Sequence, residues 1–137
     1  MIDSHCHLDH EPLFSNLNYI IKRSKDIGIK KILTICTTLK SFEKIKEIVK
    51  KDEIIFGTYG IHPHETKDNK VTSNEIIKKI NKKKKVVGIG ETGIDLFHNN
   101  SDKGTKITRL DENIKASIEL KIPIIITYRN SANYTHM

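Results

Sequence analysis

The sequence predicts an α/β fold built on a parallel sheet, because short β-like runs alternate with longer amphipathic segments along its 137 residues. The strands are rich in isoleucine, which is typical of strands that are buried on both faces. Strands that alternate with helices pair in parallel through right-handed crossovers. Two architectures fit this pattern: an open doubly wound sheet and part of a (β/α)₈ barrel.

Periodicity and local signals place five strands and four helices in alternation. The strands are expected at 2–7, 31–37, 54–60, 86–90 and 123–127, and the helices at 17–26, 42–50, 74–81 and 110–120. Gly28 ends the first helix, and Ser73 is the expected N-cap of the third. No G-x-G-x-x-G motif follows the first strand, which excludes the usual dinucleotide-binding interpretation.

The composition gives the chain a positive charge, but it does not identify a binding partner for that charge. The formal net charge is +7, yet only 3 of the 24 basic residues are arginine. Arginine is the side chain that pairs bidentately with phosphate, so codon usage in an AT-rich genome explains the lysine excess at least as well as phosphate recognition. The lysine run at 82–85 is most simply a solvated loop.

Several features favour a cytoplasmic protein. No apolar run reaches the roughly 18 residues of a membrane span, and the chain does not open with a basic and then apolar leader. Cys6 and Cys36 do not form a disulfide framework, so reduced thiols are expected.

The first strand ends in His5-Cys6-His7. Side chains two residues apart on a strand share a face, so both imidazoles project together while Cys6 points away. Asp3 and Asp9 have the same parity. Two histidines on one face form half of a metal site, although an isolated H-x-H is more often incidental.

Two further polar clusters follow strands, at 60–65 (GIHPHE) and 88–95 (GIGETGID). The simple explanation is a turn in each case, because proline and glycine end strands. The functional explanation makes Glu91 an oxygen ligand that could bridge two cations, with glycines that allow close backbone approach. Their position favours function, because active sites of parallel α/β proteins gather at the carboxyl ends of strands.

These motifs, in order with MIDSHCHLDH at 1–10 and IPIIITYRNSA at 122–132, resemble the TatD family of metal-dependent deoxyribonucleases. The family belongs to the amidohydrolase-like barrel hydrolases. The resemblance implies a (β/α)₈ barrel that binds two divalent cations and hydrolyses DNA phosphodiester bonds. For this chain it implies an incomplete TIM-type barrel of about five parallel strands and four helices over 1–128, followed by a polar tail over 129–137.

The resemblance also implies a metal site. His5 and His7 match the ligands of one metal, and Glu91 matches the catalytic carboxylate that both metals share. Imidazole with carboxylate suits Zn²⁺, Mn²⁺ or Co²⁺, while Mg²⁺ prefers oxygen ligands, so the identity of the divalent metal stays open.

On the substrate side, DNA is the implied partner, and no membrane partner is expected. His62 and His64 match the substrate-side histidines of the family, and Asp95 matches its loop aspartate.

Two departures from the family define the alternatives. The family's fifth strand normally ends Pro-x-x-x-His-x-Arg, whereas Thr127 stands in the histidine position here. A complete (β/α)₈ barrel also needs about 250 residues. We therefore expect a TatD-type hydrolase that is truncated and inactive alone. One alternative is a non-catalytic remnant, or one piece of a split barrel completed by a partner chain, with at most a partial metal site. The other is a basic nucleic-acid-binding module.

Overall fold

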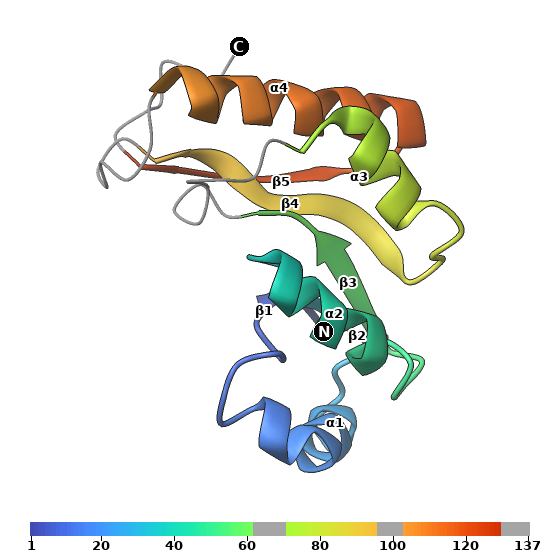
Figure 1. The fold of residues 1–137 in the computed structure, drawn as a ribbon. Coiled ribbons are helices and arrows are strands. Elements are labelled where there is room, and N and C mark those ends of the chain that lie inside the picture. The colour runs from blue at the N-terminus through green and yellow to red at the C-terminus, as the bar shows by residue number, and fades with distance from the viewer. Residues whose placement is uncertain (62–70, 96–102, 130–137) are drawn as a thin grey trace.

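The computed structural model describes residues 1–61, 71–95 and 103–129. Its five strands form one parallel sheet in the order β1-β2-β3-β4-β5, as Figure 1 shows. The strands are β1 (Ile2–Cys6), β2 (Lys31–Thr34), β3 (Ile55–Tyr59), β4 (Val86–Asp95) and β5 (Ile124–Arg129). The helices are a short 3₁₀ turn η1 (Phe14–Asn16), α1 (Leu17–Asp26), α2 (Leu39–Ile48), α3 (Ser73–Ile80) and α4 (Lys103–Leu120).

The predicted fold class is confirmed: the chain is a parallel half-barrel with four α-helices. Two elements, β4 and α4, extend well beyond their expected bounds. Strand β4 continues beyond residue 90 to Asp95, because pairing with β5 extends through Asp95 and Arg129. Helix α4 begins at Lys103 rather than at 110. Of the expected tail at 129–137, residues 130–137 lie outside the described residues.

The prediction that Ser73 is the N-cap of α3 is wrong. Thr72, not Ser73, caps the helix: its hydroxyl accepts from the Glu75 amide, and the Glu75 carboxylate accepts from the Thr72 amide at 2.8 Å. This reciprocal capping box satisfies two amides that the helix leaves unpaired. Ser73 is the first helical residue, and its amide donates instead to Glu112 on α4 at 2.6 Å.

The core lies between the sheet and its helices. Helix α2 packs on β3, where the rings of Phe42 and Tyr59 meet edge to face at 4.7 Å. Gly57 allows this approach, because a Cβ there would lie 2.5 Å from Ile45 Cγ2. Helices α3 and α4 lie side by side next to β4 and β5 (Figure 1).

The sheet is open at both edges within the described part of the chain. Strands β1 and β5 each pair with one neighbour, and apolar side chains on them are exposed, with Ile2 at 65% and Ile126 at 37%. Among the same residues, no helix has the length and apolarity that a membrane span requires.

Candidate metal centre

Glu91 is positioned by a buried backbone network at the centre of the sheet. Its amide donates to the Cys36 carbonyl at 2.8 Å. The Cys36 amide donates to Thr58 Oγ1 at 2.9 Å, and the Thr58 hydroxyl donates to the Gly90 carbonyl. Thr58 therefore ties β4 to the end of β2 beside Glu91, which restricts where the carboxylate can lie.

Glycines make this approach of strands feasible. A Cβ on Gly60 would lie 2.4 Å from the Gly90 carbonyl carbon, closer than atoms can approach. Gly90 itself has φ +140° and faces Ile125, whose carbonyl oxygen would lie 2.5 Å from an added Cβ. Only glycine adopts this backbone region without strain. The expectation that glycines permit close backbone approach at this cluster is confirmed.

The structure brings His5, His7 and Glu91 together. They offer nitrogen and oxygen atoms that all lie within 4.8 Å of one another. His5 Nε2 lies 3.8 Å from Glu91 Oε2, with 46% of the His5 side chain exposed and 11% of the Glu91 side chain. Two imidazoles and a carboxylate at this spacing supply three of the four ligands that Zn²⁺ takes, so the residues present fit a divalent cation.

A hydrogen bond orients His7 for this role. Its Nδ1 lies 3.3 Å from the Ile35 carbonyl oxygen. A carbonyl oxygen only accepts, so Nδ1 carries the proton and Nε2 keeps its lone pair for a ligand. The two imidazoles of His5 and His7 meet edge to face, with ring centroids 5.3 Å apart.

Thr127 faces Glu91 from β5. Its hydroxyl donates a hydrogen bond to Glu91 Oε1. The residue in the family's histidine position therefore touches the central carboxylate and restrains one of its oxygens. A neutral hydroxyl is a weaker metal ligand than imidazole, so this contact orients Glu91 and does not replace the missing nitrogen donor.

The two thiols are poor candidates for ligands. Cys6 and Cys36 are free, and burial raises the pKa of Cys6 to about 12 and that of Cys36 to about 11. Metal binding requires the thiolate, which these surroundings disfavour.

For the remaining predicted residues, the structure does not describe the side chains. His62 and His64 lie outside the described residues. Asp95 ends β4 in register with Arg129, and its side chain lies outside the described part of the structure.

Sequence reasoning missed the contribution of Thr58. A threonine inside a buried strand signals a hydrogen-bonded hydroxyl, but its partner is set by the tertiary fold.

A parallel half-barrel with imidazole and carboxylate donors at the carboxyl side of its strands is typical of metal-dependent barrel hydrolases. The TatD related DNase family matches residues 2–136, and the chain belongs to this family.

Relatives cover nearly the whole chain and extend beyond it. An uncharacterized metal-dependent hydrolase of Buchnera aphidicola subsp. Baizongia pistaciae is 39% identical over 140 residues, which are 98% of this chain and 52% of the relative. The 3'-5' ssDNA/RNA exonuclease TatD of Shigella flexneri is 22% identical, over 96% of this chain and 50% of its own length. The crystal structure of YjjV, a TatD homologue from Escherichia coli, matches with a TM-score of 0.85 at 23% identity, over 98% of this chain and 53% of that one. The chain thus spans about half the length of the relatives it matches.

Proposed function

We propose that residues 1–137 carry the first part of a TatD-type hydrolase site that acts on DNA phosphodiester bonds, with one divalent cation held by His5, His7 and Glu91. The observation that carries this proposal is the convergence of these three donors within 4.8 Å beside the sheet's carboxyl end. A cation bound there would lower the pKa of a bound water and stabilise charge on a phosphoryl oxygen.

The protein's own groups have distinct roles in this proposal. His7, fixed by the Ile35 carbonyl, presents Nε2 in a constant direction. Glu91 is held by the Thr127 hydroxyl at one oxygen and faces His5 with the other. His5 is half-exposed, so substrate and water reach the site from its side.

We propose that this part alone turns over DNA slowly or not at all. Thr127 supplies no imidazole for a second cation, and a two-metal clamp stabilises both the attacking and the leaving oxygen. Losing stabilisation on the order of 4 kcal/mol lowers the rate about a thousandfold. Further strands, in a longer chain or a partner chain, would pair with the open edges of β1 and β5.

The test is a chimera in which this chain is followed by the remaining half of the Buchnera relative. We expect the chimera to release nucleotides from DNA with Mn²⁺, and the His5→Ala/His7→Ala version to lose this activity. Thr127→His is expected to raise turnover in the chimera but not in the isolated chain.

Each outcome distinguishes the alternatives. Robust turnover by the isolated chain, abolished by His5→Ala/His7→Ala, would contradict the proposed need for further strands. A folded chimera that binds Mn²⁺ but cleaves no DNA would contradict the proposal that DNA is the substrate. It would favour the alternative that this chain is a non-catalytic remnant.

A further inference from the structure

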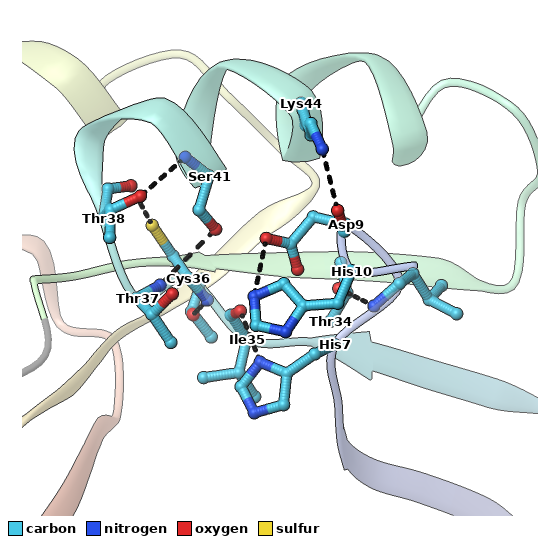
Figure 2. A network of polar contacts seen from close by, with 12 residues as sticks. His7, Asp9, His10, Thr34, Ile35, Cys36, Thr37, Thr38, Ser41 and Lys44 are labelled. Atoms are coloured by element: carbon cyan, nitrogen blue, oxygen red, sulfur yellow. Dashed lines mark hydrogen bonds and ion pairs between the residues drawn. The ribbon is translucent and has the colours of Figure 1, made fainter. Parts of the chain in front are cut away.

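The turn that follows β1 is fixed by contacts to two other elements. The His10 amide donates to the His7 carbonyl at 3.1 Å and closes the turn. The Leu8 amide donates to Thr34 Oγ1 at 3.1 Å, and Lys44 on α2 donates to the Asp9 carbonyl at 3.0 Å. Figure 2 shows the contact from Lys44 to Asp9 above the His7 and His10 rings. These contacts hold the backbone of the turn that carries His7, Asp9 and His10.

This turn brings together a second set of donors. His7, Asp9 and His10 offer nitrogen and oxygen atoms within 4.8 Å of one another. The His7 and His10 rings stack at 5.1 Å with 17° between their planes. His10 Nε2 faces Asp9 Oδ2 at 3.4 Å, and 58% of the His10 side chain is exposed (Figure 2). An ion can reach these donors from solvent past His10.

Asp9 is the buried member of this set. It is only 3% exposed, and its Oδ1 has no hydrogen-bond partner among the residues that the structure describes. A buried carboxylate is costly unless it is paired or coordinates a metal. The nearby Lys44 ammonium bonds the backbone carbonyl of Asp9.

We propose that His7, Asp9 and His10 form a second cation site, which takes a divalent transition-metal ion such as Zn²⁺, Co²⁺ or Ni²⁺. Two nitrogens and one carboxylate oxygen favour these ions over Mg²⁺ and Ca²⁺, and water completes the coordination.

The second site competes with the first. His7 Nδ1 is engaged by Ile35, so only Nε2 can bind a metal, and one lone pair serves one ion. An ion at Asp9 and His10 takes His7 from His5 and Glu91. Excess metal of this class would then inhibit a hydrolase that uses the first site.

Co²⁺ titrations followed by visible absorption test the inference. We expect one Co²⁺ per chain in the wild type, in His10→Ala and in His5→Ala/Glu91→Gln, with different absorption bands in the two variants. Combining all three substitutions should weaken binding at least 30-fold. His10 is exposed, so His10→Ala should fold, and circular dichroism of each variant provides the control.

The outcomes separate this site from the proposed function. Loss of Co²⁺ binding in folded His5→Ala/Glu91→Gln overturns the second site and leaves the first intact. Two ions bound at once in the wild type overturn the sharing of His7. One ion retained by His5→Ala/Glu91→Gln and lost on adding His10→Ala supports the second site, whether or not any version cleaves DNA.

Discussion

The carboxyl end of the parallel sheet gathers imidazole and carboxylate groups, whereas its amino end gathers lysines. At the amino end a hollow of about 480 Å³ is lined by Val49, Val86, Glu47 and six lysines: Lys46, Lys50, Lys82, Lys83, Lys84 and Lys85. At the carboxyl end hydrogen bonds hold two of the donor side chains, His7 through the Ile35 carbonyl and Glu91 through the Thr127 hydroxyl. The side chains of Lys82, Lys83 and Lys84 are exposed.

The comparison shows that arrangement, more than the amount of charge, distinguishes the two ends. Lys46 and Lys50 pair with glutamates of helix α2, at 2.7 Å from Glu43 and 2.8 Å from Glu47. Such exposed pairs contribute little to stability. Lys85 differs from its neighbours, because its ammonium donates to three backbone carbonyls and acts as a structural group. The interpretation of 82–85 as a solvated loop therefore fits the first three lysines and not the fourth.

The largest difference between the ends is expected for cation binding. His7→Ala removes the nitrogen that both donor sets share, so Co²⁺ affinity should fall about 100-fold or more. Lys84→Ala at the amino end should leave it unchanged. Calorimetric titration of both variants measures the effect, and equal weakening by the two would mean that the ion binds elsewhere.

The next largest difference is expected in stability, when either of two glycines with positive φ is replaced by alanine. At the carboxyl end Gly93 has φ +146°, and an added Cβ would lie 1.8 Å from the Thr127 carbonyl oxygen. Gly93→Ala should therefore lower the free energy of unfolding by about 3 kcal/mol or more. Gly28 precedes β2 at the other end and has φ +85° with nothing within 4 Å of an added Cβ, so Gly28→Ala should cost about 1 kcal/mol. Urea denaturation measures both, and equal losses would contradict the tight contact at Gly93.

Two lysines of the amino end, Lys85 and Lys84, should also differ in their contribution to stability. Lys85→Met leaves the carbonyls of Asp52, Glu53 and Ile55 without their donor, and we expect a loss of about 2 kcal/mol. The exposed Lys84→Met should stay within about 0.5 kcal/mol of the wild type. Comparable denaturation midpoints for the two variants would show that the Lys85 hydrogen bonds contribute nothing.

The sequence predicted the order of strands and the proximity of the His5 and His7 side chains, although β1 ends at Cys6 and His7 lies just beyond it. It did not predict the full length of β4, because the glycines at 88–95 disfavour a strand that pairing with β5 nevertheless stabilises. It also did not show that His10 meets Asp9 beside His7. That arrangement depends on Thr34 and Lys44, which lie far along the chain.

The smallest expected effect lies where α3 and α4 meet. The Ser73 amide and the Lys115 ammonium donate to Glu112 and lower the pKa of its carboxyl to about 2. The ordinary value is 4.5, so the folded protein holds this proton less tightly than the unfolded chain. The stabilisation is therefore fully present above pH 4.5 and is lost as the pH falls towards 2.

Glu112→Gln should lower the melting temperature at pH 7 and have progressively less effect down to pH 2, as followed by circular dichroism. Glu119→Gln, an exposed carboxylate on the same helix, is the control. If the two variants changed melting alike at every pH, the bond between Glu112 and the α3 N-terminus would not contribute to stability.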